Sequence, residues 1–309
     1  MSSETTPGRA ESTAPDERTT PASPYQVPAP SHGRSPWRRL LRNPAGVVGL
    51  VLAATTVTVA VAAPLLAPQD PAAVDFDRLL AQPSLTAWLG TDELGRDQVA
   101  RVIYGVRSSL FVGVLAVLLA VVVAVPLGLA AGYYRRVVDP IVSRLTDAVM
   151  AFPFLVLAVG LAAILGPSLT NAAIAIGIAQ IPPLIRVMRG EALRLSQENY
   201  VEGAIAGGAS DLVVLFKYIL PNAGNALLVQ ITVGIPAAMI GEAMLSFLGL
   251  GVQPPTPSLG VMLSDAMAFF IHAPWLAVFP GLMLVLVTLG FNLLGDGLRD
   301  ALDPKGRRR

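Results

Sequence analysis

The chain has 309 residues, of which 53% are hydrophobic and only 14% are charged, and its formal net charge is +1. Soluble domains carry about 25% charged residues, so this composition predicts a membrane protein, and the near-neutral charge argues against a nucleic-acid partner. The chain has no cysteine, which excludes disulfides and zinc–thiolate sites, and His32 and His272 are too far apart to suggest a metal motif, so we expect neither a metal nor a cofactor.

Residues 1–35 are rich in Pro, Ser, Thr and Ala without a hydrophobic period, which is typical of a disordered arm. This arm has no apolar core of the kind that marks a secretory signal. Residues 36–68 follow, with a basic, aromatic motif from Trp37 to Pro44 and then an apolar span over Ala45–Leu66. The span is long enough to cross a bilayer core, which needs about 20 apolar residues.

Residues 69–106 are predicted to form a loop that ends in an interfacial helix. The acids Asp92, Glu93 and Asp97 do not match the ligand spacing of a calcium loop, so we expect them to form a turn and to cap the helix. One apolar stripe follows at helical spacing: Val99, Val102, Ile103 and Val106. We expect this helix to lie along the membrane interface before the next span turns inward.

Five further spans are predicted within residues 107–297. They are Ser109–Ala131, Ala148–Leu165, Ala172–Val187, Ala226–Leu250 and Leu276–Leu294. The span that begins at Ala172 is short and is broken by Pro182 and Pro183, which is tolerated where neighbouring helices cover the freed backbone groups. The sequence therefore predicts an all-α, polytopic membrane protein with six transmembrane helices.

Arginine and lysine gather in alternate segments between these spans, which indicates the orientation of the protein. If the amino terminus is cytoplasmic, the basic residues near Arg135, those of the stretch 191–221 and those of the tail 298–309 all lie on the cytoplasmic side. The opposite side has four basic residues, all in the first loop: Arg78, Arg96, Arg101 and Arg107. The bias predicts that both termini and the stretch 191–221 are cytoplasmic.

This cytoplasmic stretch cannot lie in lipid, because it carries several charged residues. We expect Ser196 to cap a first helix that stops at Gly208. A second short helix would be capped by Ser210 or Asp211 and closed by Pro221. The small residues between the two helices would let another surface approach the backbone closely.

Six residues of the stretch match a known loop: Glu202, Gly203, Ala204, Gly208, Leu220 and Pro221. They resemble the EAA loop of binding-protein-dependent ABC importer permeases. Gly203 stands where that family has alanine, and Tyr218 stands where an apolar residue is usual. In the family this loop forms a coupling helix that sits in a cleft of the cytoplasmic ATPase, so the resemblance implies the same role here.

Four longer motifs occur in order along the chain: WLGTDELGRD at 88–97, DAVMAFP at 147–153, SFLGLGVQPP at 246–255 and FNLLGDGLRDALDP at 291–304. They resemble one subfamily, the C-type permease subunit of dipeptide, oligopeptide and nickel importers, from Trp37 to Pro304. The resemblance implies the type I ABC importer permease fold in the plasma membrane of a prokaryote. It also implies four kinds of partner: a second permease of similar fold, two ATPase subunits, an extracytoplasmic solute-binding protein and a peptide substrate.

Glu242 is the most unusual charge within a predicted span, because a carboxylate in lipid is costly and should face the bundle interior or a cavity. Two interpretations stay open. Glu242 could line a translocation path with Gln230 and Gln180 and meet a peptide amine, or it could make a hydrogen bond between helices. The proline-rich loop from Gly251 likewise could meet a binding protein or cover the pathway.

The chain has no P-loop, since its two lysines, Lys217 and Lys305, do not follow glycine, so ATP hydrolysis would come from separate subunits. We therefore expect a permease subunit that is not an enzyme and that moves dipeptides or oligopeptides through an ATP-driven importer. An importer of nickel or another small solute is the nearer alternative. A membrane enzyme or a scaffold is the alternative of another class, and it would need a polar cluster at one depth or a large soluble domain.

Overall fold

The computed structural model describes residues 36–302, and the predicted arm of residues 1–35 and the last residues of the tail, 303–309, lie outside this part. Its helices are, in chain order, α1 (Pro36–Leu40), α2 (Pro44–Val61), α3 (Ala63–Leu66), α4 (Gln98–Tyr133), α5 (Val138–Met150), α6 (Phe154–Leu165), α7 (Leu169–Leu195), α8 (Asn199–Ala206), α9 (Asp211–Val213), α10 (Leu220–Phe247), α11 (Leu259–Ala266) and α12 (Trp275–Leu302). A π-helix (Val214–Ile219) joins α9 to α10, and short 3-10 helices lie at Phe76–Arg78 and Met267–Phe269. The predicted all-α class is confirmed for the described residues.

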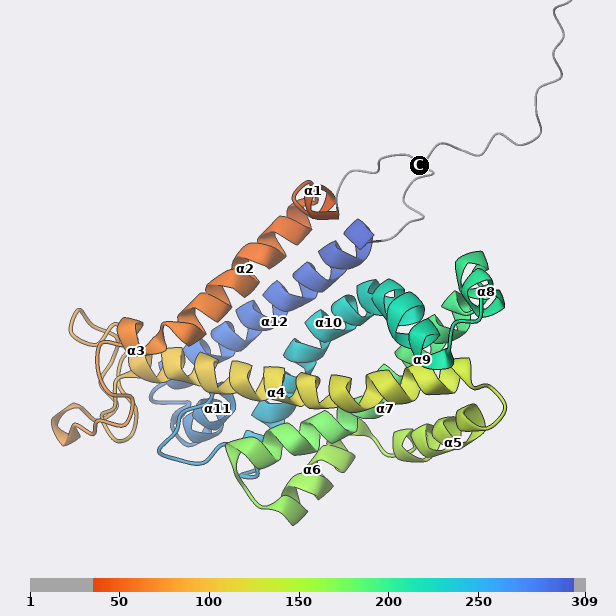
Figure 1. Ribbon diagram of the computed structural model, residues 1–309. Helices are drawn as coiled ribbons and strands as arrows, with labels where there is room; N and C mark the ends of the chain where they lie inside the picture. Colours follow the sequence, from red (N-terminus) through yellow and green to blue (C-terminus); the bar gives the residue numbers. More distant parts are fainter. Residues whose placement is uncertain (1–35, 303–309) are drawn as a thin grey trace, which may run out of the picture. The chain divides into compact units, whose positions relative to one another are not determined.

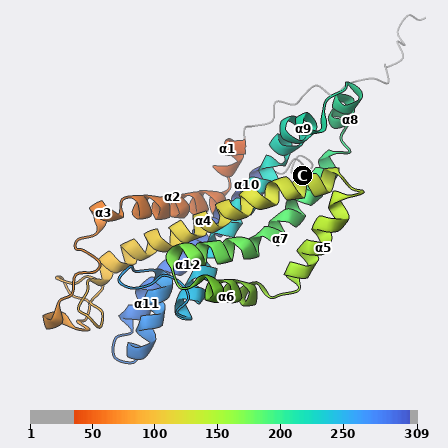
Figure 2. The ribbon, with the colours of Figure 1, turned by 60° about the horizontal axis from the view of Figure 1, so that its bottom comes forward.

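Within residues 36–302, five helical segments are long and apolar enough to cross a membrane: α2, α4, α7, the continuous stretch Asp211–Phe247 and α12. The helices α5 and α6 pass the same test together, although they are bent by 87° at the break between them. The six predicted spans are found when this pair counts as one. Both views show α8 and α9 at one end of the bundle and α11 at the other (Figures 1 and 2). These are called the α8 end and the α11 end below.

The helices α4 and α7 run side by side because two glycines of α4 let the backbones approach closely. A Cβ on Gly128 would lie 2.6 Å from the Cβ of Met188, and one on Gly132 would lie 2.5 Å from the Cβ of Ala192. Small residues at such positions are the usual means by which membrane helices pack. The core beside this contact is built from α4, α7, the π-helix and the start of α10, with one residue each from α5 and α8.

The predicted break at Pro182 and Pro183 is wrong, because α7 runs without interruption for 27 residues through both prolines. Proline removes one helical hydrogen bond and crowds the preceding turn, but such a break is tolerated where a neighbouring helix covers the freed backbone groups. The contact of α7 with α4 provides that support along the same stretch.

The first loop does not lead into a separate interfacial helix. The helix α4 spans 36 residues from Gln98 to Tyr133, so the expected turn before the second span is wrong. Val102 and Val106 of the predicted stripe are buried. Their face of α4 therefore packs against other helices, so no bend is needed to cover these apolar side chains.

The predicted span Ala148–Leu165 is not one helix, because the chain bends between Met150 and Phe154. Pro153 directly precedes α6. Proline cannot donate a backbone hydrogen bond, and it disfavours the helical conformation for the residue before it, here Phe152. The bend therefore has a local cause in the sequence.

The first and last long helices, α2 and α12, pack antiparallel through glycines. A Cβ on Gly49 would lie 2.3 Å from the backbone nitrogen of Leu294, and one on Gly297 would lie 2.6 Å from the Cα of Gly46. Asn43 Nδ2 also donates to a carboxylate oxygen of Asp300. The start of α2 and the end of α12 are thus held together.

Candidate functional site

The segment between α7 and α8 begins with Ser196, which caps the end of α7 and not the start of α8. Ser196 is the C-cap of α7, so its predicted role as the N-cap of the next helix is wrong. Its hydroxyl is already used: it donates to the carbonyl of Leu193 and accepts from Arg135 Nη2 at 2.8 Å. The helix α8 begins only at Asn199, and Glu198 is its N-cap without a side-chain capping bond.

The end of α8 has the predicted glycine stop. Gly208 has a φ of +82°, which is the left-handed conformation that glycine adopts without strain. Its N–H bonds the carbonyl of Ile205, and the N–H of Ala209 bonds the carbonyl of Ala204, both at 3.0 Å. These two bonds form a Schellman motif, which ends the helix sharply.

The surface around this stop is open and partly apolar. A Cβ added to Gly203 or Gly208 would meet nothing within 4 Å. Large apolar side chains are exposed close by in the sequence: Ile205, Leu212, Val213 and Phe216. We call α8 and the turn to Ser210 the knuckle. An exposed backbone of small residues beside apolar side chains is suited to contact with another protein.

The segment after the knuckle is not a separate helix that Pro221 closes, so this prediction is wrong. The chain continues through α9 and the π-helix directly into α10, and Leu220 and Pro221 are its first residues. Because the helical stretch is continuous here, Pro221 supplies no N–H to the preceding turn. Of the six matched loop residues, Glu202 to Gly208 thus lie in or beside the knuckle, and the last two lie on a span.

The knuckle is anchored firmly in the bundle. Val201 of α8 and Val214 and Ile219 of the π-helix are fully buried, in one core cluster with Met188 and Ala192 of α7. Polar contacts add to this at the same end, since Tyr133 Oη donates to Asp211 Oδ1 at 3.0 Å. A force on the knuckle would therefore reach α7 and α10 without passing through a flexible linker.

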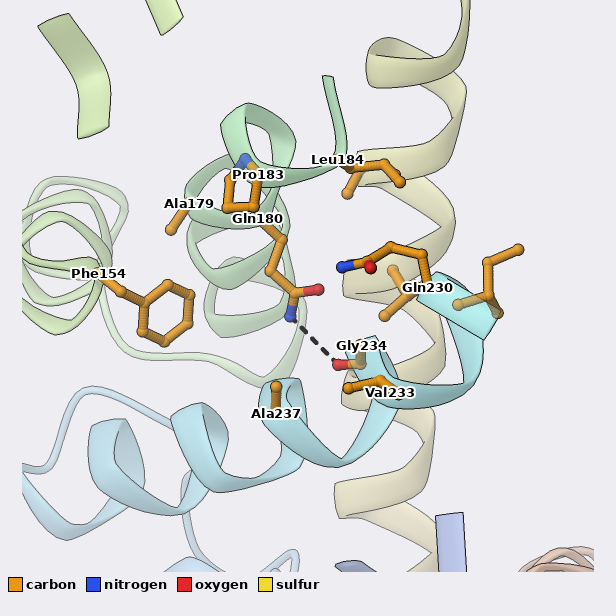
Figure 3. A pocket seen from close by; sticks show the side chains of 12 residues that line it. Phe154, Ala179, Gln180, Pro183, Leu184, Gln230, Val233, Gly234 and Ala237 are labelled. Atoms are coloured by element: carbon orange, nitrogen blue, oxygen red, sulfur yellow. Dashed lines mark hydrogen bonds between the residues drawn. The ribbon is translucent and has the colours of Figure 1, made fainter. Parts of the chain in front are cut away.

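A cavity of about 220 Å³ lies between α4, α6, α7 and α10 (Figure 3). Gln180 and Gln230, the two glutamines singled out from the sequence, both line it. Gln180 Nε2 donates to the carbonyl of Gly234 at 3.4 Å. Pro183 supplies no N–H to the carbonyl of Ala179, another lining residue. The lining residues carry no ionisable side chain, so the polar groups here are uncharged.

Glu242 does not line this cavity. It is fully buried further along α10, where its carboxylate accepts from Ser109 Oγ at 2.7 Å and from Ser246 Oγ at 2.6 Å. The bond to Ser109 joins α10 to α4. The structure therefore brings the two glutamines together and places the third candidate residue in a contact between helices.

The loop before α4 has the predicted turn and cap, together with ion pairs that sequence reasoning missed. Asp97 accepts from the backbone N of Ala100 at 2.8 Å, and Asp92 accepts from the backbone N of Arg96 at 2.9 Å. The carboxylate of Asp92 also pairs with the side chains of Arg96 and Arg101, at 2.7 and 3.1 Å. The four-residue spacing of Asp92 and Arg96 was a visible signal for the first pair.

Comparison with known proteins identifies the family. Residues 124–308 match the model of the binding-protein-dependent transport system inner membrane component, and residues 31–83 match the N-terminal TM domain of oligopeptide transport permease C. The dipeptide transport system permease protein DppC of Alkalihalophilus pseudofirmus is 45% identical over 275 residues, covering 88% of this chain and 90% of the relative.

Two further relatives are similar over a comparable length. The glutathione transport system permease protein GsiD of Pectobacterium atrosepticum is 43% identical over 270 residues, 87% of this chain and 90% of the relative. DppC of Haemophilus influenzae is 42% identical over 278 residues, 87% of this chain and 93% of the relative. These matches confirm the resemblance drawn from the motifs: the chain is an integral membrane protein that belongs to the family of binding-protein-dependent transport system inner membrane components.

Proposed function

We propose that this chain is the C-type permease subunit of an ATP-driven importer that carries dipeptides or oligopeptides across the plasma membrane of a prokaryote. It would work with a second permease of similar fold, two cytoplasmic ATPase subunits and an extracytoplasmic solute-binding protein. The family model describes a binding-protein-dependent component, and relatives that match most of this chain bear the names of dipeptide and glutathione permeases.

The knuckle is the observation that carries this proposal. It is an exposed helix end of small residues, closed by a left-handed glycine and rooted in the core through Val201. An ATPase that closes on ATP would push the knuckle, and α7 and α10 would move with it. In this mechanism the bundle switches between two packings, and ATP and the delivered solute bias the two states. The α8 end is then cytoplasmic, as are both termini, and the α11 end faces outward.

The cavity beside Gln180 and Gln230 supports a peptide as the cargo. Each glutamine amide carries both donors and an acceptor, which matches the N–H and C=O groups of a peptide bond. The lining has no fixed charge that would hold a peptide terminus tightly. Such a site would form hydrogen bonds with a passing peptide without binding it tightly.

Reconstitution of the whole transporter tests the proposal. The two permeases and two ATPases would be placed in liposomes and supplied with the binding protein, ATP and a labelled dipeptide, with the non-hydrolysable ATP analogue as the control. We expect uptake that requires both ATP hydrolysis and the binding protein. Uptake of Ni²⁺ but of no peptide would instead show the alternative cargo, and uptake of neither would refute the transport function.

A further inference from the structure

The helix α11 is too short to cross a bilayer, and it lies on one face of α4 at the α11 end. Arg101, Gly105 and Ser109 form this face of α4, since residues four apart lie on one side of a helix. Gly105 leaves room for α11, because a Cβ there would lie 3.3 Å from the backbone nitrogen of Leu259 and 3.4 Å from Met262 Sδ.

The opposite side of α11 touches α10 just as closely. A Cβ on Gly260 would lie 2.4 Å from the Cα of Ala243 and 3.0 Å from the Cβ of Ser246. The helix α11 is therefore wedged between the ends of α4 and α10, and it also packs against α12. Those two helices also border the cavity that holds Gln180 and Gln230.

The beginning of α11 is held by a saturated buried network. Ser109 Oγ donates to one oxygen of the Glu242 carboxylate and accepts from the backbone N of Leu259 at 3.3 Å. Ser246 Oγ donates to the other oxygen and accepts from the backbone N of Val252 at 3.2 Å. Each hydroxyl thus uses its donor and an acceptor site. Opening this end would leave several buried polar groups unpaired, which is strongly disfavoured.

The end of α11 has a weaker polar contact, although its last residue, Ala266, is buried in an apolar cluster with Ala273 and Leu276. Arg101 Nη2 lies 3.8 Å from Asp265 Oδ2, at the limit of an ion pair, and the side chain of Asp265 is 38% exposed. The Nε of Arg101 is already paired with Asp92 at 3.1 Å. Its Nη1 is buried and has no hydrogen-bond partner among the described residues. The guanidinium of Arg101 therefore has hydrogen-bonding capacity that no described residue uses.

We propose that α11 is a gate of the transport cycle, hinged at the Ser109–Glu242–Ser246 network and latched by the pair Arg101–Asp265. Glu242 and Arg101 are then positioning residues that act through α11. This inference rests on the proposed transport function, and the gate covers the outward-facing end of the bundle. When the latch is released, α11 turns about Leu259 and the wedge between α4 and α10 is withdrawn.

The latch is tested with Asp265→Asn in the reconstituted transporter, because this variant removes the charge and keeps the side chain's shape. A weaker latch raises the population of the released state, so ATP hydrolysis and peptide uptake without binding protein should rise several-fold. Asp265→Glu, which restores the charge, should return both rates to the wild-type values. Asp77→Asn, which removes an exposed aspartate of the first loop, is the matched control and should change neither rate. Equal rates in Asp265→Asn and Asp77→Asn would overturn the latch.

The hinge is tested with Glu242→Gln and two labelled cargoes, a dipeptide and its N-acetyl derivative. A hinge residue does not touch the cargo, so the maximal rate should fall for both and their ratio should equal that of the wild type. A variant that loses only the wild-type preference for the free amine would show that Glu242 contacts the substrate, which contradicts the proposal. Ser246→Ala serves in the same assay if Glu242→Gln does not assemble. Failure of the proposed function itself would appear differently, as no peptide uptake by the wild type.

Discussion

Arg189 of α7 holds Asp139 of α5 through two hydrogen bonds, with Nε–Oδ1 at 2.5 Å and Nη2–Oδ2 at 2.7 Å. This bidentate pair ties the first half of the bent span to α7, and Arg186 adds a second contact to Asp147 at 2.6 Å. Paired, parallel bonds of this kind fix geometry as well as adding stability. The position of α5 beside α7 therefore depends on charge as well as on apolar packing.

Asp139→Asn should destabilise the protein by roughly 1 kcal/mol, because the pair is partly exposed and its charge-assisted bonds are lost. The measurement is thermal unfolding of the purified protein in detergent. Arg194→Gln is the control, since Arg194 forms a more exposed pair with Glu191 and its loss should have a smaller effect. Equal shifts in the melting temperature would show that the bidentate geometry adds nothing.

Gly132→Leu should prevent the close approach of α4 and α7. Its Cβ would lie 2.5 Å from the Cβ of Ala192 and 2.6 Å from the carbonyl oxygen of Arg189, so the helices must separate. Overpacking of this kind costs about 1–3 kcal/mol and often more when backbone atoms clash. The yield of folded protein on size exclusion should fall sharply. Gly160→Leu, where a Cβ meets nothing within 4 Å, should give the wild-type yield, and a normal yield from Gly132→Leu would contradict this packing.

Gln230→Leu should slow peptide uptake about fivefold, because one hydrogen bond of ordinary strength to the cargo would be lost within the cavity. The readout is the maximal rate of ATP-driven uptake in liposomes, with membrane insertion checked separately. Gln69→Leu, an equivalent change in the exposed first loop, should leave the rate unchanged. Wild-type uptake by Gln230→Leu would show that the cavity is not on the path.

The length of the apolar runs identified the helical spans. Where a helix ends or continues through a proline depends on neighbouring helices, and the local sequence does not show these. Pro153 ends one helix, whereas Pro182 and Pro183 lie inside another, because α7 is supported by α4 at Gly128 and Gly132. The effect of a proline on a span was therefore decided by its neighbours.

In the candidate sites, too, local features were predictable from the sequence and contacts between distant residues were not. The stop at Gly208 was predictable, since only a residue that tolerates the left-handed conformation closes a helix in this way. Gln180 and Gln230 were singled out as polar residues near Glu242, but they line a cavity that Glu242 does not reach. The pairing of Arg101 with Asp265 was not, because the two residues are far apart in the sequence and meet only when α11 lies on α4.

The most direct test of the account compares two glycines of the same geometry at opposite ends of the bundle. Gly208 and Gly249 both have positive φ, of +82° and +75°, and a Cβ on either meets nothing within 4 Å. Gly208→Trp and Gly249→Trp therefore impose similar backbone strain, and they should insert into the membrane equally well. We expect Gly208→Trp to abolish ATP-driven peptide uptake in liposomes, with Gly249→Trp retaining it. Normal uptake by Gly208→Trp would contradict the claim that the ATPases act on the knuckle.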